Sequence, residues 1–420
     1  MQTKNLFALT ALCAALAACG GGDGGSDPAP APTDKFTQKN GTWTFQLPAA
    51  GVSVCYDFDT KKEVAGCTGT AWDLKVTSAS RTATLWTNSG TSSSPSDTGK
   101  GGAFGGPFDH TWTELQTYKD ATVDPASGSA LPAAVYTADA ASGAFSGTND
   151  IQSAAFEYDL NGDHRLSPNF RVFLITSNSA NAAATGAGVF ALQVTGYYGG
   201  GGGTTSGYPS FRWIERTSGA VVKTAQVNAS AGWVYYDLVN NKEVAETGAW
   251  QIAFNRYTVK LNGGGSGSGT VAGYVGKTPA GFYNTDGTPI TSKFNVTTNV
   301  SDTLPDLTAG DIATPASASA WVKDKLASVL NPAYRGTYGV DPLDYGWFKY
   351  YSTAELAVKA GLPDVPHIIA ANPANGSLIR GGEGNSYARV HLNSITYADP
   401  RDNSSAQTWT FGYDLQPASN

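Results

Sequence analysis

Short runs of alternating apolar and polar residues dominate the chain, and they predict β-strands. Residues 43–47 alternate as the side chains of a half-buried strand do. Runs rich in Val, Thr, Tyr and Phe, bounded by Gly, Asn and Ser, occur at 189–198, 208–216, 250–261 and 387–397. The pattern therefore predicts a mainly β protein in which long glycine-rich loops join antiparallel strands.

Two segments have the spacing of a helix. Apolar residues recur at helical intervals in 317–330, and a proline follows them. Residues 352–360 begin with a capping box, Ser352 and Glu355, and a glycine ends them. We therefore expect a few short helices beside the sheets.

One series of motifs occurs twice in the same order. The first copy has Tyr56-Asp57-Phe58, Lys62-Glu63-Val64 and Trp72-Asp73-Leu74, and the second has Tyr236-Asp237-Leu238, Lys242-Glu243-Val244 and Trp250-Gln251-Ile252. The aromatic strands late in each half also correspond, although more loosely. We therefore predict two tandem antiparallel β modules, 36–216 and 217–420, each long enough to bury its own core.

Composition and charge narrow the function. The chain has 27 basic and 34 acidic residues, a net charge of −7, and no basic cluster, which argues against nucleic-acid binding. Its 10 Trp, 20 Tyr and 17 Phe are more than a disordered chain carries, so most of it should fold. No nucleophile-elbow motif and no spaced carboxylate pair stands out, so we do not expect an enzyme.

The N-terminus resembles that of a bacterial lipoprotein. Lys4 precedes a short apolar run, and Leu16-Ala17-Ala18-Cys19-Gly20 is similar to a lipobox. The resemblance implies a signal peptide at 1–18, lipidation of Cys19 and a flexible linker over 19–35. An ordinary secretory signal is the alternative. We expect a lipid anchor in the bacterial outer membrane, on the cell surface or the periplasmic face.

Only two cysteines, Cys55 and Cys67, remain beyond the predicted lipidation site. They flank a predicted strand–turn–strand segment, and a hairpin there would bring them within disulfide distance in an oxidising compartment. Two inert thiols are the alternative. Zinc needs more Cys or His at short spacing than the sequence offers.

The repeated motifs together resemble the HmuY-type haem-binding lipoproteins. The shared features are the lipobox, the Tyr-Asp…Lys-Glu-Val hairpin, the Trp-(Asp/Gln)-(Leu/Ile) strand, the Asn-(Ser/Gly)-Gly loop and the late Tyr-rich strands. The segment from Phe156 through Tyr158 to Pro168 is similar to the one that precedes a long central strand in the family. The resemblance implies a predominantly β fold that holds haem in a cleft between loops. It also implies delivery of the haem to an outer-membrane TonB-dependent transporter.

Haem, iron protoporphyrin, or a related tetrapyrrole needs axial ligands and an apolar slot. Met1 is the only methionine and leaves with the signal, so histidines are the candidates. The resemblance implies ligands from loops, which selects His110 and His164 as a bis-imidazole pair. The rings that could face the porphyrin are Phe104, Phe108, Trp112 and Tyr158. Neutral imidazole is the ligating form, so acid should weaken binding.

The second module departs from this pattern. At the place that we align with His164 it has Thr353-Ala354-Glu355-Leu356, and its counterpart of the His110 loop includes Tyr283. His367 and His391 lie at or within predicted strands and are more typical of core or face residues. This module is therefore structural, uses Tyr283 as an oxygen ligand, binds something else, or shares a site with the first. A surface adhesin or carbohydrate-binding protein is the alternative function.

Overall fold

The computed structural model describes residues 33–89, 99–181 and 183–418. The predicted signal peptide, Cys19 and most of the predicted linker lie outside these residues. Strands dominate, and all named strands pair in antiparallel fashion, which confirms the predicted fold class. Within the described ranges, no helix is long and apolar enough to cross a membrane. The strands form two lobes, each with its own hydrophobic cores.

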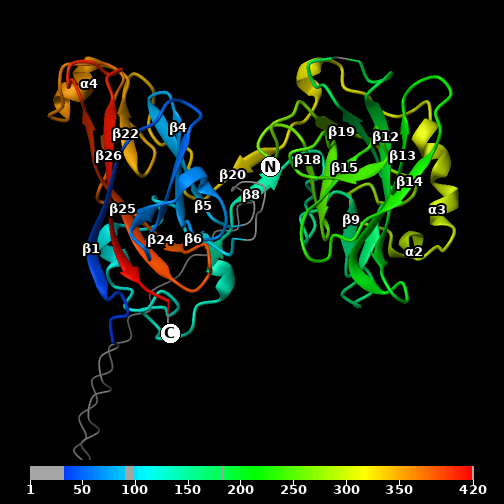
Figure 1. Cartoon of the computed structure of the whole chain (residues 1–420), viewed down its shortest axis with the longest axis horizontal. Coiled ribbons are helices and arrows are strands. Elements are labelled where there is room, and N and C mark those ends of the chain that lie inside the picture. The colour runs from blue at the N-terminus through cyan, green and yellow to red at the C-terminus, as the bar shows by residue number, and fades with distance from the viewer. Residues whose placement is uncertain (1–32, 90–98, 182, 419–420) are drawn as a thin grey trace, which may run out of the picture. The chain divides into compact units, whose positions relative to one another are not determined.

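Lobe A contains residues 36–139 and 328–416. Its main sheet has the order β1–β26–β25–β24–β6–β7, with bounds Gln38–Gln46, Gln407–Gln416, Tyr387–Tyr397, Ser377–Arg380, Gly102–Phe104 and Tyr136–Thr137. A second sheet, β3–β2–β4–β5, spans Lys62–Glu63, Ser53–Asp57, Leu74–Ala79 and Thr82–Thr87. A third, β21–β22–β23, spans Leu343–Asp344, Phe348–Tyr351 and Ile368–Ala371. Figure 1 shows β1, at the blue end of the chain, beside β26 at the red end.

Lobe B contains residues 140–327, drawn in cyan to yellow in Figure 1. Its main sheet has the order β14–β13–β12–β11–β19, with bounds Lys223–Gln226, Thr205–Glu215, Val189–Gly199, Val172–Thr176 and Ala272–Lys277. A second sheet, β16–β15–β17–β18, spans Lys242–Val244, Val234–Asp237, Ile252–Asn255 and Thr258–Leu261. Two strand pairs complete it: β9 (Phe156–Tyr158) with β10 (Leu166–Pro168), and β8 (Ala140–Ser142) with β20 (Lys325–Ala327).

Alternation explains why these segments form half-buried strands. Along β26, the side chains of Trp409, Phe411, Tyr413 and Leu415 point into one core of lobe A and are at most 2% exposed. In lobe B, Phe211 and Trp213 of β13 enter the equivalent core with Phe254 of β17. Burial of such large side chains is the main driving force for folding each lobe.

The lobes do not follow the predicted module boundary. Strand β1, from the first predicted module, pairs with β26 from the second, and β11 from the first pairs with β19 from the second. The expectation that 36–216 and 217–420 would each bury a core is therefore wrong. The repeat exists in the order of strands, but each lobe combines the early half of one copy with the late half of the other.

Short helices complete the fold. The α-helices are α1 (Trp112–Leu115), α2 (Thr291–Phe294), α3 (Asn299–Asp302) and α4 (Ala354–Lys359), and the 3₁₀ turns are at Ala65–Cys67, Ala133–Val135, Leu304–Thr308 and Ala318–Ala320. The helix predicted at 352–360 is α4, but Thr353 caps it by accepting from Leu356 N–H at 3.3 Å, in place of Ser352.

The helix predicted at 317–330 is wrong. Val322 exchanges backbone hydrogen bonds with Gly273, and β20 pairs with β8. The carboxylate of Asp324 also accepts the Leu261 N–H at 2.9 Å. These tertiary pairings outweigh the helix preference of a segment that contains good helix formers such as Ala, Leu and Lys.

The predicted strands agree with the structure more closely than this predicted helix does. The long strand predicted at 387–397 is β25 over the same residues, and 189–198 and 208–216 fall within β12 and β13 to within one residue. The run predicted at 250–261 is two strands, β17 and β18. Arg256 adopts a left-handed φ of 52° between them and turns the chain back as a hairpin.

Candidate functional site

His164 is held outward at the tip of the β9–β10 hairpin in lobe B. Its backbone φ is 55°, and its N–H donates to Asp159 Oδ1 at 2.6 Å, which fixes the turn. The side chain is 79% exposed, and Nδ1 lies 3.1 Å from the hydroxyl of Tyr158. Nearby, Tyr198 accepts the Leu166 N–H at 2.9 Å, and the Arg165 guanidinium lies over the Tyr198 ring at 4.2 Å.

His367 occupies the same position in lobe A. His367 directly precedes β23, and His164 lies two residues before the start of β10. The backbone φ of His367 is 60°. Its Nδ1 lies 2.6 Å from the hydroxyl of Tyr350, and Tyr397 accepts the Ile369 N–H at 2.9 Å. The alignment of His164 with Thr353–Leu356 is therefore wrong, because α4 is inserted between β22 and β23 and the equivalent residue comes after it.

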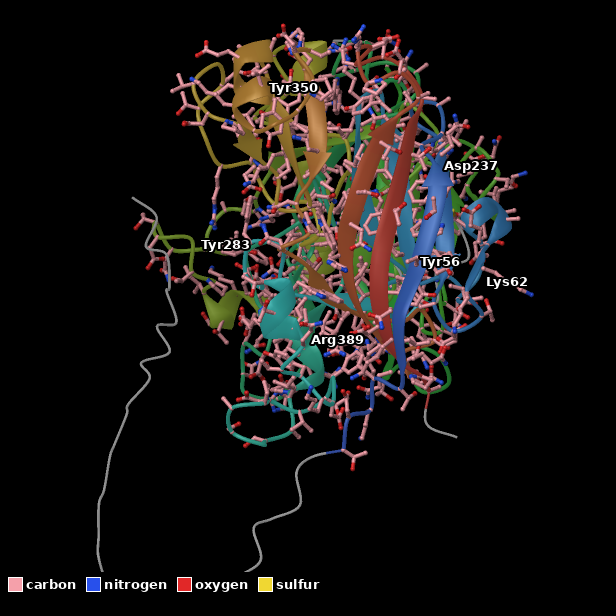
Figure 2. All side chains as sticks on the ribbon, turned by 90° about the vertical axis from the view of Figure 1, so that its left-hand side faces the viewer. Tyr56, Lys62, Asp237, Tyr283, Tyr350 and Arg389 are labelled. Carbon is pink, nitrogen blue, oxygen red and sulfur yellow. A yellow bond between two sulfur atoms is a disulfide. The ribbon has the colours of Figure 1, made fainter. Side chains whose placement is uncertain are left out.

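Exposed apolar and aromatic side chains lie in the loop that precedes β21. Tyr334 and Tyr338, in the loop before β21, are 50% and 61% exposed, and Val340 is 66% exposed. The Tyr334 ring packs on Tyr345 at 5.4 Å. The Tyr338 hydroxyl hydrogen-bonds to Tyr350, and burial together with this neighbour raises the pKa of Tyr350. Figure 2 shows Tyr350 at the end of lobe A opposite to Arg389.

His110 belongs to lobe A but lies in the loop between β6 and α1. Its ring stacks on Phe104 at 4.9 Å, and its Nδ1 lies 3.3 Å from Glu114 Oε1. The other predicted rings are already in contact with protein groups: Phe108 lies under the Arg335 guanidinium at 4.2 Å, and Trp112 stacks on His391 at 3.8 Å. The predicted pair thus takes His110 from one lobe and His164 from the other, and its shared ligation of iron stays a prediction.

Two further candidate ligands, His391 and Tyr283, form hydrogen bonds within the protein. His391 Nδ1 lies 3.0 Å from the Pro373 carbonyl, and burial lowers the pKa of His391, so the ring stays neutral against Trp112. The Tyr283 hydroxyl donates to Glu157 Oε1 at 2.6 Å, and burial raises the pKa of Tyr283. A phenolate ligand must lose its proton, so the setting of Tyr283 disfavours that role.

The disulfide between Cys55 and Cys67 is present, with a Cα–Cα distance of 5.4 Å. Both cysteines pack on Trp72 in a small cluster of lobe A. Lobe B has Tyr235 at the position of Cys55, and this tyrosine packs on Trp250, the counterpart of Trp72. The crosslink therefore supports one lobe only.

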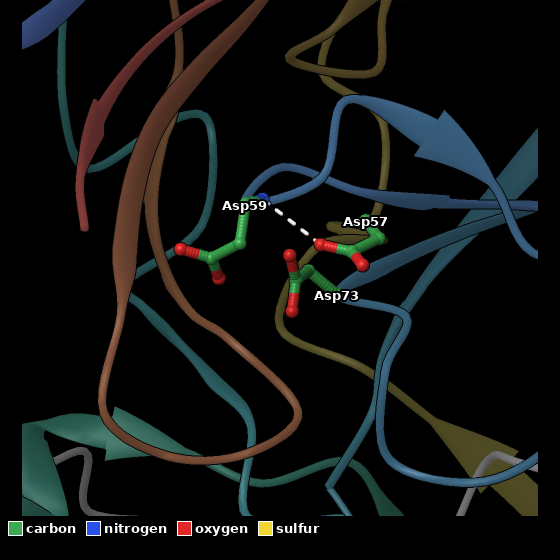
Figure 3. Close-up of side chains that lie close together, drawn as sticks. All are labelled: Asp57, Asp59 and Asp73. Carbon is green, nitrogen blue, oxygen red and sulfur yellow. Dashed lines mark hydrogen bonds between the residues drawn. The ribbon is translucent and has the colours of Figure 1, made fainter. Parts of the chain in front are cut away.

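Three carboxylates approach one another at the end of the β2 hairpin: Asp57, Asp59 and Asp73 (Figure 3). Their oxygens accept hydrogen bonds from the protein itself, both from the turn and from the segment around Gly382. Asp57 Oδ1 accepts from Asp59 N–H at 2.9 Å, and Asp73 accepts from Phe58 N–H and Gly382 N–H at 2.8 Å each. Burial raises the pKa of Asp73 well above its usual value. In lobe B, Gln251 replaces Asp73 and accepts the Leu238 N–H at 2.7 Å, so the contact needs no charge.

A cavity of about 680 Å³ opens in lobe B beside β17 and β18. Its lining includes Trp233, Trp250, Tyr257, Lys260 and Glu246. The Lys260 ammonium lies over the Trp233 ring at 4.2 Å, and the Trp233 indole N–H is buried with no hydrogen-bond partner in the structure. The volume of this cavity suits a ring. No histidine lines it, however, so its wall offers no imidazole ligand.

Comparison with known families finds a likeness for the C-terminal part of the chain. The model of the HmuY protein family matches residues 229–413. Over these residues the chain is similar to the HmuY family. HmuY proteins are a haem-binding family and not a family of enzymes. No curated protein matches the chain. The HmuY match falls within the predicted second module, and it includes His367 and His391 but neither His110 nor His164.

Proposed function

We propose that the protein is a lipid-anchored haem-binding protein of the bacterial outer membrane that delivers haem to a TonB-dependent transporter. The HmuY match over residues 229–413 carries the proposal. The lipobox-like sequence before Cys19 supports the anchor, and the exposed imidazole of His164 at the tip of the β9–β10 hairpin supports capture of a ligand from solution. Haem is cargo here, so affinity and release matter rather than catalysis.

The imidazole of His164 is suited to ligate iron. With Nδ1–H donating to the Tyr158 oxygen, the lone pair of Nε2 faces outward. A hydrogen bond at one imidazole nitrogen fixes the tautomer and ring orientation, and it raises the basicity of the other nitrogen. His110, held against Phe104, is the predicted second ligand of the same iron.

Hemin titration of the full chain tests the proposal. We expect a sharp Soret band and split α and β bands on reduction, the signature of two imidazole ligands. His164→Asn is the appropriate variant, because asparagine tolerates the left-handed backbone at this position. His164→Asn and His110→Gln should each abolish the low-spin spectrum. Wild-type protein that shows only the spectrum of free hemin would refute haem binding.

Carbohydrate binding is the second candidate, and the cavity of lobe B favours it. Trp233 and Tyr257 are only partly buried in its wall, and aromatic faces of this kind stack on the apolar face of a sugar ring. Glycan-array binding that is lost in Trp233→Ala, together with no hemin uptake, would establish this function in place of the first.

A further inference from the structure

The same edge strand is covered in lobe A and open in lobe B. In lobe A, β5 is the last strand of its sheet, and the side-chain amide of Asn331 covers it. Leu85 N–H donates to Asn331 Oδ1, and Asn331 Nδ2 donates to the Leu85 carbonyl, both at 2.8 Å. The corresponding edge strand of lobe B is β18, in which Val259 has the place of Leu85. Leu85 pairs with Val76 on β4, and Val259 pairs with Phe254 on β17.

The backbone of Val259 faces away from β17. Leu261 N–H donates to the Asp324 carboxylate at 2.9 Å, so it points to the free edge of the sheet. Backbone groups alternate in direction along an antiparallel strand, so Val259, two residues earlier, also directs its N–H and its C=O to this edge. Within the described ranges, no residue bonds to these two groups on that side. Val259 lines the cavity of lobe B, and the open edge therefore lies in its wall.

A single change of residue explains the difference between the lobes. Asn331 follows β20, and Ser146 follows β8 at the same distance from the end of the strand. Both residues end the same turn: Asn331 N–H donates to Ser328 C=O at 3.0 Å, and Ser146 N–H donates to Gly143 C=O at 3.1 Å. The short side chain of Ser146 instead accepts the Gly143 N–H at 2.8 Å. Ser146 and Val259 both line the cavity, so the space that the asparagine fills in lobe A is open in lobe B.

We propose that the cavity of lobe B binds a flat ring that carries a planar amide edge, with an N–H and a C=O side by side. The ligand's amide takes at Val259 the place that the Asn331 side chain has at Leu85. Primary carboxamides and cyclic amides both have such an edge. The inference concerns the same cavity as the carbohydrate candidate but names a different ligand. It does not depend on haem binding, since no histidine lines the cavity.

The walls of the cavity favour a ring over a peptide strand. Trp233 and Tyr257 line it, and aromatic faces pack favourably on flat rings. Addition of a peptide strand relies on a series of backbone hydrogen bonds along a sheet edge. The edge of β18, whose residues are all described, offers only the pair at Val259, because Asp324 already accepts the Leu261 N–H. The volume of about 680 Å³ lies in the range of small-molecule sites.

Hydrogen exchange tests whether the edge is open. In wild type, amide exchange followed by NMR should be slow for Leu85 N–H and fast for Val259 N–H, because only the first is hydrogen-bonded. Ser146→Asn should slow the exchange of Val259, and Asn331→Ser should accelerate that of Leu85. Equally slow exchange of the two amides in wild type would mean that the edge of lobe B is closed, and it would overturn the proposal.

Saturation-transfer NMR on the full chain tests the ligand. The probes are nicotinamide, a carboxamide on a flat ring, and uracil, a cyclic amide. Their fully N-methylated forms lack the N–H donor and are the matched controls. We expect at least one probe to bind, and its methylated form to bind about tenfold more weakly, because the Val259 carbonyl loses its donor. Ser146→Asn should cause a loss of the same size, whereas Ser146→Ala should keep the binding. Far-UV circular dichroism checks the fold of both variants.

The outcomes decide between the ligands. Binding of nicotinamide alone or of uracil alone supports the proposal and identifies the source of the amide. If neither probe binds, or if the methylated forms or Ser146→Asn bind equally well, the proposal is wrong. A methyl glucoside that binds wild type and Ser146→Asn alike, while the probes do not bind, would favour the carbohydrate candidate instead. Hemin is absent from all these measurements, so their failure leaves the proposed haem function untouched.

Discussion

Arg389 and Asp414 face each other across β25 and β26 at 2.8 Å, and their side chains are only 2% and 6% exposed. The guanidinium also lies over the Phe36 ring at 4.0 Å and donates to the carbonyl of Leu115. Lobe B has a related pair. Here the arginine lies on the later of the two strands: Arg212 on β13 donates to Gln193 on β12 at 2.9 Å. Each lobe therefore buries one arginine between its two longest strands.

The ion pair of lobe A predicts a large penalty for removing one partner. Arg389→Met should lower the free energy of unfolding by about 3–5 kcal/mol, because it leaves the Asp414 carboxylate buried without a cation. Arg389→Met with Asp414→Asn should recover most of this loss, since asparagine keeps an acceptor for the Asn40 N–H. Urea unfolding followed by tryptophan fluorescence measures both. A double variant as unstable as the sum of its singles would contradict the explanation.

Asp324 predicts a pH dependence of stability. Burial raises the pKa of Asp324 from 3.8 to about 6 despite the hydrogen bond from Leu261. The folded state therefore binds this proton more tightly than the unfolded state does. Its contribution is fully present below about pH 4 and is lost as the pH rises to about 6, by roughly 3 kcal/mol.

Asp324→Asn should remove that dependence while keeping an oxygen for the Leu261 N–H. The difference in unfolding free energy between variant and wild type should therefore favour the variant increasingly from pH 4 to pH 7. Asp286→Asn is the control, because hydrogen bonds from Thr288 lower the pKa of that exposed carboxylate; its contribution to stability is lost mainly below about pH 4, so this variant should show little change between pH 4 and pH 7. A difference for Asp324→Asn that is the same at pH 4 and pH 7 would rule out this account.

The Cys55–Cys67 disulfide should stabilise lobe A selectively. The two cysteines are 12 residues apart, and closing a loop of this length is worth about 3 kcal/mol of unfolded-state entropy. The Cys55→Ala, Cys67→Ala variant should lose about that much on thermal unfolding. Reduction of wild type should produce the same loss and leave the variant unchanged. If reductant destabilised the variant equally, the loss would come from elsewhere in the protein.

Local patterns in the sequence predicted elements well but not the partners of those elements. The alternation of apolar and polar residues along 387–397 predicted β25 correctly, because this alternation depends only on residues that are neighbours in the sequence. The segment at 317–330 failed because its structure depends on β8 and Gly273, far away in the chain. The repeat predicted that two similar modules exist, yet it contained no information on whether β1 pairs with the late strands of its own copy or of the other.

The candidate site was predicted to a similar extent. His164 and Tyr158 were selected from sequence, and the structure adds that they touch. His367 was missed, because α4 lengthens the Tyr-to-His separation from 6 residues in lobe B to 17 in lobe A. In lobe B, Leu166 pairs with Tyr158, and in lobe A, Ile369 pairs with Tyr350. An alignment of the two lobes on these tyrosines and their partners would have matched His164 with His367.

The exchange of strands between the two copies can be tested with a crosslink. Thr44 on β1 faces Thr410 on β26, and their hydroxyl oxygens are 3.0 Å apart. Cysteines at both positions should form a disulfide that joins the N-terminal and C-terminal strands, because facing residues of an antiparallel pair lie within bridging distance. Peptide mapping by mass spectrometry under non-reducing conditions detects the linked fragments.

The matched control is Thr44→Cys with Ser210→Cys. In lobe B, Ser210 on β13 pairs with Gln226 on β14. Gln226 therefore has the place in lobe B that Thr44 has in lobe A. In an arrangement without exchange, Thr44 would face Ser210, and this second pair would form the crosslink instead. Efficient linkage of 44 to 210 with none of 44 to 410 would therefore overturn the strand exchange, because a strand cannot occupy both edges at once.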